Sequence, residues 1–343
     1  MIDIKQVLDT IIQGNTFEVL KEFPPQSVDC IMFSPPYWSL RYYEIEDVGI
    51  DGWKGQFGLE PHPQLYIDHM VYLCKLLKPI LKNDGSMWIN IGDCYYTKSG
   101  SNYAGSTEQF TQHAQKVGLP IGNQLRELYK SNWLQSKQLL CVPERIITRL
   151  QDEQGWILRN KVIWHKPNAI PDSVKDRLKM TWEYLYHLVK QDKYYYDLDS
   201  IRESYATSSL QGSKYKSLGK NPGDMWIIPT SSSFYRGIKH SATYPEQLCV
   251  RPILATCPVN GLVLDPFIGS GTTGVVAKRL GRHFIGIELN KEYIEIVMKR
   301  INNEKIEIKK EQMKIPTCPK CGGPVKLIGK RFYCMKALCD GVL

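Results

Sequence analysis

Short apolar runs alternate with segments of helical periodicity over the first 93 residues. Val28–Phe33 has the pattern of a buried parallel strand, and it ends at two consecutive prolines, which cannot continue a strand ladder. Apolar residues then recur at helical spacing over 64–81, and a second strand-like run follows at 86–91. This strand–helix–strand order predicts an α/β domain.

Two polar segments interrupt this pattern. Residues 94–140 include a Gly/Ser-rich stretch and predict an inserted loop region, and residues 198–240 are irregular, polar and basic. The remaining expected elements are helices over 143–154, 275–280 and 290–301, and strands over 156–164, 183–190, 262–265 and 283–289.

The composition is that of a globular protein, because 43% of the 343 residues are hydrophobic and 23% are charged. No apolar stretch approaches the roughly 20 residues of a membrane span, and the first ten residues lack the pattern of a signal peptide. We therefore expect a cytoplasmic protein with no membrane partner.

The net charge of +9 is unevenly distributed along the chain. It is −4 over 1–158, +6 over 159–240, +1 over 241–304 and +6 over 305–343. A modest excess only raises the expectation of a polyanionic partner, but its location indicates two segments in which to look for contacts with one.

A glycine-rich turn at 265–274 follows one predicted strand and opens a helix. Gly269, Gly271 and Gly274 have the G-x-G-x-x-G spacing, and Glu288 ends the next strand, so a nucleotide-containing cofactor is expected here. A close-packed turn without a ligand is the plain alternative. A dinucleotide dehydrogenase is disfavoured, because no second nucleotide-binding half follows and Asp265 would place a carboxylate near the pyrophosphate.

The turn Ser34-Pro35-Pro36-Tyr37 ends a different predicted strand. Two prolines fix the backbone, which leaves the Pro35 carbonyl and the Ser34 hydroxyl as rigid neighbouring acceptors for an exocyclic amino group. Tyr37 offers a face on which a planar base could stack. The alternative is a proline-rich strand exit whose aromatic residues pack in the core.

Residues 34–43 resemble the catalytic motif of S-adenosylmethionine-dependent DNA amino-methyltransferases, and 265–273 are similar to their cofactor loop. The catalytic motif precedes the cofactor loop, as in the circularly permuted β-class, and the resemblance covers about 1–304. It implies a Rossmann-like, doubly wound, mostly parallel sheet, which is the class I methyltransferase fold, in a methyltransferase domain that spans 1–304.

The resemblance also implies roles for individual residues. The catalytic residues would be Ser34, Pro35, Pro36 and Tyr37. The residues binding S-adenosylmethionine would be Asp265, Pro266, Phe267, Gly269, Gly271, Thr272, Thr273, Glu288 and, on the adjoining wall, Pro245.

In this family a serine at the first motif position usually accompanies transfer to the 4-amino nitrogen of cytosine, and Asp or Asn usually accompanies the 6-amino nitrogen of adenine. Cytosine N4 is therefore favoured, with adenine N6 as the alternative. Methylation at carbon 5 is disfavoured, because the sequence has no Pro-Cys dipeptide to supply the nucleophile. An RNA or other amino substrate and a catalytically silent DNA-binding relative remain as further alternatives.

The resemblance places target recognition at about 198–240, and the expected partner is double-stranded DNA. A solvated basic loop is the alternative. The sequence leaves open whether a cognate restriction endonuclease accompanies this protein and whether the protein forms a homodimer. The residues expected to contact DNA are Trp38, Arg41, Lys166, Arg177, Lys214, Lys216, Lys220, Arg236 and Lys239.

Four cysteines gather in the basic C-terminal segment. Cys318 and Cys321 form a C-x2-C knuckle, and Cys334 and Cys339 follow. Their spacing predicts a structural zinc ion in a small zinc-ribbon-like module at 317–343, after a basic helix or linker at 305–316. Free or redox-active thiols are the alternative, and the surrounding lysines predict non-specific affinity for DNA.

Overall fold

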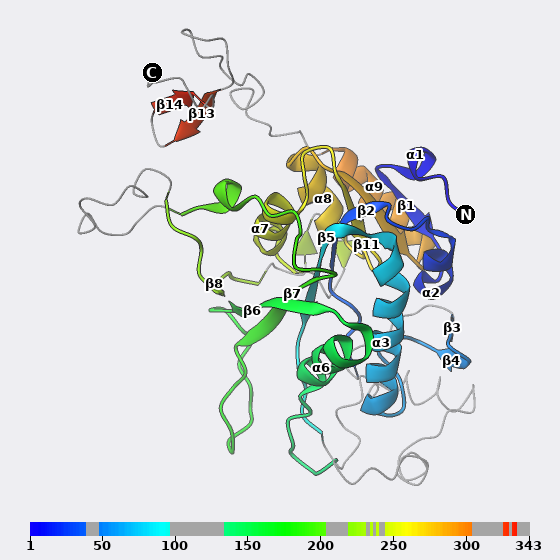
Figure 1. The fold of residues 1–343 in the computed structure, drawn as a ribbon. Coiled ribbons are helices and arrows are strands. Elements are labelled where there is room, and N and C mark those ends of the chain that lie inside the picture. Colours follow the sequence, from blue (N-terminus) through cyan, green and yellow to red (C-terminus); the bar gives the residue numbers. More distant parts are fainter. Residues whose placement is uncertain are drawn as a thin grey trace, which may run out of the picture.

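The computed structural model describes residues 1–38, 48–96, 134–203, 219–230 and 244–303. It also describes the backbone of four short strands, which are β9 (Phe234–Tyr235), β10 (Ile238–Lys239), β13 (Val325–Ile328) and β14 (Arg331–Cys334). Figure 1 shows the arrangement of the elements around one central sheet.

The central sheet has eight strands, and seven of them run in the same direction. Only β7 runs antiparallel to both of its neighbours, β5 and β6. In spatial order the strands are β1 (Thr10–Gln13), β12 (His283–Glu288), β11 (Leu262–Asp265), β2 (Val28–Phe33), β5 (Leu81–Ile91), β7 (Trp182–Val189), β6 (Ile157–His165) and β8 (Met225–Ile227).

Helices cover both faces of this sheet (Figure 1). One face packs against α2 (Thr16–Val19), α3 (Pro63–Ile80) and α6 (Val142–Gln154), and the other against α7 (Glu246–Thr256), α8 (Thr272–Arg279) and α9 (Lys291–Asn302). Alternate side chains of the central strands serve the two layers: Ile31 and Phe33 join the first, whereas Cys30 and Met32 join the second. The doubly wound, mostly parallel α/β fold is thus confirmed.

The remaining elements are short. They are α1 (Ile4–Val7), η1 (Leu20–Glu22), β3 (Val48–Ile50), β4 (Trp53–Gly55) and η2 (Leu198–Ile201). None of the helices in the described part of the chain is both long and apolar enough to cross a membrane.

The strand expected at 28–33 and the helices expected at 64–81 and 143–154 are confirmed within one or two residues. The strand expected at 86–91 begins earlier, because β5 starts at Leu81, directly after α3. Its pairing with β2 is irregular between Val28 and Cys30, so the polar residues 82–85 lie inside the strand.

The expectation that 198–240 is irregular throughout was wrong, because η2, β8, β9 and β10 lie in this segment, and β8 belongs to the central sheet. Residues 225–227 form β8, which pairs in parallel with β6 and extends the sheet. Trp226 is 7% exposed and packs in the second layer, while Met225 and Ile227 point outward. Three residues with only one buried side chain are too short for periodicity to identify.

The insert at 94–140 is closed at its base. Tyr95 pairs with Leu139, and the backbone N–H of Tyr96 donates to Gln138 O at 2.8 Å. Residues 97–133 lie outside the described part of the chain.

In the C-terminal segment, β13 and β14 pair antiparallel, with Val325 opposite Cys334. Cys318, Cys321, Cys339 and the linker at 305–316 lie outside the described residues, and for Cys334 the backbone alone is described. The zinc-ribbon-like module therefore stays a prediction.

Candidate active site

The two sequence motifs meet at the carboxyl ends of neighbouring strands. β11 pairs in parallel with β2, with Leu264 opposite Ile31, so Asp265 and Ser34 leave the same edge of the sheet. From this point β11 is followed by β12 on one side, and β2 by β5 on the other. Such a reversal of strand order opens a crevice, where α/β proteins commonly bind ligands.

The glycine-rich turn depends on its glycines. Gly269 and Gly271 have φ values of +46° and +80°, in the left-handed region that favours glycine. A Cβ atom at Gly271 would also collide with the side chain of Val297 in α9. The turn therefore packs closely against α9.

Asp265 is buried, with 1% of its surface exposed. Its Oδ1 accepts a hydrogen bond from Phe267 N at 2.9 Å, and its Oδ2 accepts from Thr273 at 2.6 Å and from Tyr244 at 3.1 Å. Burial raises the pKa of this carboxyl to about 6. Asp265 thus holds the turn together with its own hydrogen bonds.

Thr273 links the turn to the strand that carries the second motif. Its hydroxyl bonds Asp265 and Tyr244, and it lies 3.5 Å from the carbonyl of Met32, two residues before Ser34. Burial, and then the Asp265 carboxylate, raise the pKa of Tyr244 well above its ordinary value. The Tyr244 hydroxyl therefore stays protonated, and it brings the neighbouring Pro245, the N-cap of α7, to the turn.

Glu288 ends β12 beside the turn, and it is half-buried. Its Oε2 accepts from Gly269 N at 3.2 Å, and its Oε1 accepts from Asn290 N at 2.8 Å. Burial raises the pKa of this carboxyl. The segment after β1 lies alongside, because Gly14 N donates to Glu288 O at 3.0 Å and Thr16 donates to the carbonyl of Pro266.

Residues of α3 and of the loop before it hold the Ser34–Tyr37 turn and the adjacent Trp38 in place. Tyr66 donates to the carbonyl of Pro36 at 2.9 Å, and the indole of Trp38 donates to the carbonyl of Glu60 at 2.8 Å. Among the described residues, no hydrogen bond reaches the carbonyl of Pro35. The Pro35 carbonyl thus has no hydrogen-bond partner in this part of the chain, and it lies beside the half-buried Ser34 hydroxyl, although Pro35 itself is buried.

Tyr37 belongs to a polar network. Its hydroxyl lies 2.8 Å from Glu183 Oε2, 3.3 Å from Asn90 Oδ1 and 3.4 Å from Ser34 Oγ. Burial, and then the Glu183 carboxylate, raise the pKa of the Tyr37 phenol well above its ordinary value. The hydroxyl therefore remains a donor, and Glu183 is its best-placed acceptor.

An aromatic surface joins the two motifs. The Phe267 ring stacks on Phe57, with centroids 5.5 Å apart and an interplanar angle of 21°, and it lies 6.1 Å from the ring of Phe33. Phe267 is half-buried, whereas Phe33 and Phe57 are buried. A planar ligand group at the turn would thus find a packed aromatic neighbour.

Comparison with known proteins places these motifs in one family. The family described as DNA methylase, whose name covers N6 and N4 methyltransferases, matches residues 28–299. The chain belongs to this DNA methylase family. It is therefore a DNA methyltransferase, and S-adenosylmethionine is its methyl donor.

The similarity of the chain to individual methyltransferases supports its membership of this family. The chain is 37% identical to type II methyltransferase M.Cfr9I of Citrobacter freundii, over 86% of this chain and 88% of that protein. PvuII DNA methyltransferase (cytosine-N4-specific) has a TM-score of 0.58 at 22% identity, over 88% and 89% of the two chains. A provisionally assigned DNA modification methylase of Thermus thermophilus, complexed with S-adenosyl-L-methionine, has a TM-score of 0.53 at 21% identity, over 86% and 93%.

The residues of this DNA methylase fit its cofactor. The Glu288 carboxylate accepts from the backbone N–H groups of Gly269 and Asn290 and also interacts with that of Leu289; since a carboxylate offers about four acceptor sites, it can still accept from a ribose hydroxyl. Asp265 is buried and its oxygens already bond protein donors, and its expected place among the cofactor-binding residues stays a prediction.

Of the residues expected to contact DNA, some are ion-paired or buried, and the side chains of the others lie outside the described part of the chain. Lys166 is ion-paired with Glu183, Arg177 pairs with Asp172 at 2.9 Å and stacks over Tyr95, and Lys220 lies 3.6 Å from Glu203. Trp38 is 6% exposed. Arg41, Lys214, Lys216 and Arg236 lie outside the described residues, and for Lys239 the backbone alone is described.

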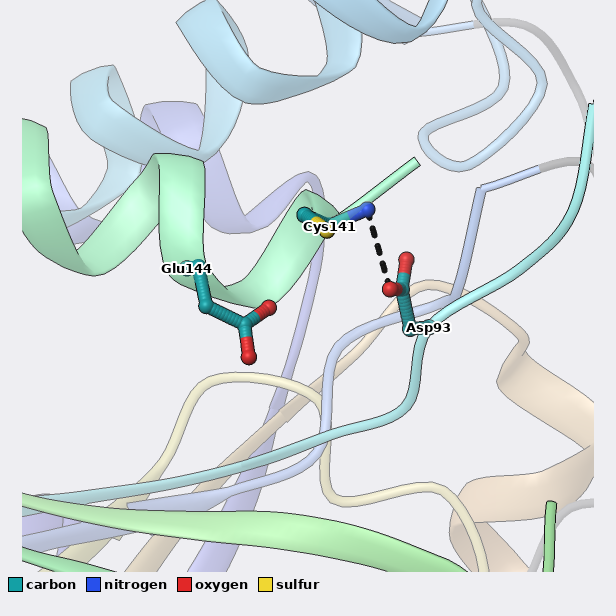
Figure 2. A group of neighbouring side chains, drawn as sticks. All are labelled: Asp93, Cys141 and Glu144. Carbon is teal, nitrogen blue, oxygen red and sulfur yellow. Dashed lines mark hydrogen bonds between the residues drawn. The ribbon is translucent and has the colours of Figure 1, made fainter. Parts of the chain in front are cut away.

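A group of three side chains that could hold a metal ion is explained by hydrogen bonding within the protein. Asp93, Cys141 and Glu144 each place one ligand atom within 4.8 Å of the others (Figure 2). The Asp93 carboxylate, however, accepts from the backbone N–H groups of Cys94, Cys141 and Val142 at 2.9–3.0 Å. It thus caps the first turn of α6, while Glu144 pairs with Lys161 at 3.0 Å.

The sequence interpretation missed four residues that build this site: Thr16, Asn90, Glu183 and Tyr244. Thr16 follows a strand of only four residues, which is too short for a clear hydrophobic periodicity, so the sequence did not predict that strand. Tyr244 precedes Pro245 within the segment that resembles the family, and that position was the available signal. Asn90 and Glu183 come from separate strands, and only the pairing of β5 with β7 brings them together.

Proposed function

We propose that this DNA methylase transfers a methyl group to the exocyclic N4 amino group of cytosine in a base flipped out of double-stranded DNA. One observation carries the proposal: the Ser34 hydroxyl and the Pro35 carbonyl follow β2, directly beside β11 and its glycine-rich turn. Two adjacent acceptors thus stand next to the cofactor loop. An exocyclic amino group inside a duplex cannot reach such a crevice, so the base must leave the stack.

The residues act by position and charge. The lone pair of the target nitrogen is delocalised into the ring, which makes the amino group a poor nucleophile. Hydrogen bonds from its two hydrogens to Ser34 Oγ and Pro35 O draw the nitrogen toward tetrahedral geometry and localise that lone pair. Pro36 keeps the Pro35 carbonyl in place, and Tyr37 stacks on the base. S-adenosylmethionine supplies an electrophilic methyl group on a sulfonium sulfur.

We assign the cofactor pocket to the residues of the turn and its walls. Glu288 would accept from the ribose hydroxyls, and Asp265 would act from behind the turn through Thr273 and Phe267. The lining residues in this proposal are Pro266, Phe267, Gly269, Gly271, Thr272, Thr273 and Pro245.

Cytosine N4 is preferred to adenine N6 for two reasons. Serine occupies the first position of the motif, and the solved relative PvuII DNA methyltransferase carries the description cytosine-N4-specific. Adenine N6 is the second candidate, because the family includes enzymes of both kinds.

The proposal extends to the whole chain. Residues 1–304 form a circularly permuted methyltransferase domain, 198–240 read the target sequence, and 317–343 bind a structural zinc ion. Since M.Cfr9I is named a type II methyltransferase, we assign a restriction–modification role, with a cognate endonuclease that cleaves the unmodified site.

Nucleoside mass spectrometry tests the proposal. Unmethylated bacterial DNA is incubated with the protein and S-adenosylmethionine and then digested to nucleosides. N4-methylcytosine is the expected product, and the Ser34→Ala protein is the control for a contaminating activity. N6-methyladenine would establish the second candidate, and the absence of any methylated base would overturn both.

A further inference from the structure

Glu183 lies at the start of β7, where that strand borders the catalytic turn. Its Oε2 accepts from the Tyr37 hydroxyl at 2.8 Å and from Asn90 Nδ2 at 3.2 Å, and its Oε1 forms an ion pair with Lys166. The side chains of Glu183 and Lys166 are only 15% and 18% exposed. Strand β5, the catalytic turn after β2 and the loop after β6 thus converge on one carboxylate of β7.

The network orients the Tyr37 ring as well as its hydroxyl. Asn90 also donates to the carbonyl of Tyr184 at 3.0 Å, which fixes the amide next to Glu183. On the ring edge, a Cβ atom at Gly92 would come within 2.9 Å of Tyr37 Cε2 and 3.3 Å of Glu183 Cγ. Close packing on one side and a hydrogen bond at the end leave the ring little freedom to rotate.

A carboxylate this close to the site needs a compensating charge. An unpaired, largely buried carboxylate is costly, and Lys166 supplies the compensating cation. The acceptor matters because a tyrosine that stacks on a flipped base must hold one ring plane. Fixing that plane before the base arrives removes an ordering cost from the reaction.

We propose that Glu183, supported by Lys166 and Asn90, is a positioning residue that locks the Tyr37 ring in the orientation needed to stack on the flipped base. This inference rests on the proposed function of the same site. Glu183 acts through Tyr37, so its removal should slow turnover without changing how the cofactor binds.

A matched pair of variants isolates the acceptor. In Lys166→Met/Glu183→Gln, the glutamine carbonyl can still accept from Tyr37, whereas in Lys166→Met/Glu183→Leu nothing at 183 can. Both variants lack the ion pair, so neither leaves an unpaired lysine, and any effect of removing Lys166 on DNA binding is common to both. We expect kcat on plasmid DNA to be about tenfold lower in the leucine variant than in the glutamine variant. Cofactor affinity by calorimetry should agree within about twofold.

Tyr37→Phe completes the test. Added to the glutamine variant, it should lower kcat by the same factor, and added to the leucine variant, it should change nothing further. A structural role alone would lower the melting temperature and the cofactor affinity together, and it would not depend on the Tyr37 hydroxyl. Equal kcat in the two parent variants, or an equal loss on adding Tyr37→Phe to each, would overturn the inference.

A second ion pair provides the control. Lys161 of β6 and Glu144 of α6 are 3.0 Å apart, and their side chains are 39% and 37% exposed. Lys161→Met/Glu144→Leu should keep kcat within about twofold of the wild type. If the wild type itself methylates no DNA base, the proposed function fails; if it is active and the matched pair is equal, only the role of Glu183 fails.

Discussion

One hydroxyl group ties the two motifs of the active site together. Thr273 bonds Asp265 in the glycine-rich turn and lies near the carbonyl of Met32, just before the catalytic serine. A change at Thr273 would therefore disturb both motifs at once. Among the residues that the structure describes, the Ser34 hydroxyl makes one weak hydrogen bond, to Tyr37 at 3.4 Å, so its contribution can be measured alone.

Replacing Ser34 with alanine should remove turnover and spare the cofactor. The substitution deletes one of two acceptors for the target amino group, and the loss of one such polar contact costs about 100-fold in kcat. Cofactor affinity, measured by calorimetry, should stay within about twofold. Wild-type turnover in Ser34→Ala would remove Ser34 from the reaction.

Asp265→Asn tests the raised pKa of the buried carboxyl. A folded-state pKa of about 6 lies above the ordinary value, so the folded protein holds this proton more tightly than the unfolded chain does. The carboxyl therefore makes the wild type less stable as pH rises toward and through 6, and asparagine removes that dependence. Asparagine can keep the contacts, because the hydroxyls of Thr273 and Tyr244 can rotate.

The measurement is the free energy of unfolding in urea at pH 5 and pH 7. Between these values, Asp265→Asn should gain about 1 kcal/mol relative to the wild type. Parallel pH profiles of the two proteins would show that the Asp265 carboxyl titrates in its ordinary range.

At the scale of elements, what the sequence could predict depended on local pattern. β2 and α3 have long, regular patterns, and their bounds were predicted closely. β1 and β8 have four and three residues, and their places at the sheet edges depend on partners distant in the sequence. Glu183 shows the same limit within the site, because a carboxylate in β7 gains its role only where it meets Tyr37 and Lys166.

The start of α6 offers a test at this scale. Cys141, its N-cap, has a φ of +54° and no capping hydrogen bond from its own side chain, so the Asp93 carboxylate from the end of β5 takes that place. Asp93→Ala should lower the free energy of unfolding by about 1–2 kcal/mol. Glu144→Gln, which changes the other carboxylate of this cluster, should lower it by less than about 1 kcal/mol.

The same pair of variants separates capping from metal binding. Added Zn²⁺ or Mn²⁺ should leave the melting temperature of the wild type unchanged, since Asp93 is already occupied by three backbone donors. A metal-dependent rise in the wild type that is absent from Asp93→Ala would contradict the capping role.

At the scale of the whole molecule, the excess positive charge is concentrated in two segments of the chain. The segments 159–240 and 305–343 each carry +6, whereas 1–158 carry −4. Some of the charge in the first segment is neutralised internally, because Lys166 and Arg177 pair with carboxylates. The C-terminal segment is therefore the larger candidate for non-specific attraction to phosphates.

Deleting 305–343 should weaken DNA binding and flatten its salt dependence. For every phosphate that the shortened protein no longer neutralises, the slope of log K against log salt should fall by about 0.9. The deletion variant should keep its kcat at saturating DNA, which serves as the control for folding of the catalytic domain. An unchanged salt slope would show that this segment does not contact DNA.

Metal analysis tests the cysteine cluster independently. If Cys318, Cys321, Cys334 and Cys339 hold zinc, the purified full-length chain should contain zinc, and Cys318→Ser/Cys321→Ser should not. Turnover should persist in that variant, because the thiolates lie outside the catalytic domain in sequence. A zinc-free wild type would favour free thiols.

The order of the strands also determines when during synthesis the active site can form. β2, with the catalytic turn, leaves the ribosome early, but its neighbour β11 follows only much later; Asp29 and Leu262, which hydrogen-bond across this seam, are 233 residues apart. β1 waits longer still, since Asp9 meets His283. A nascent chain therefore carries unpaired strand edges and cannot form the cofactor pocket until β11 and β12 have emerged, so shorter partial products should not methylate DNA.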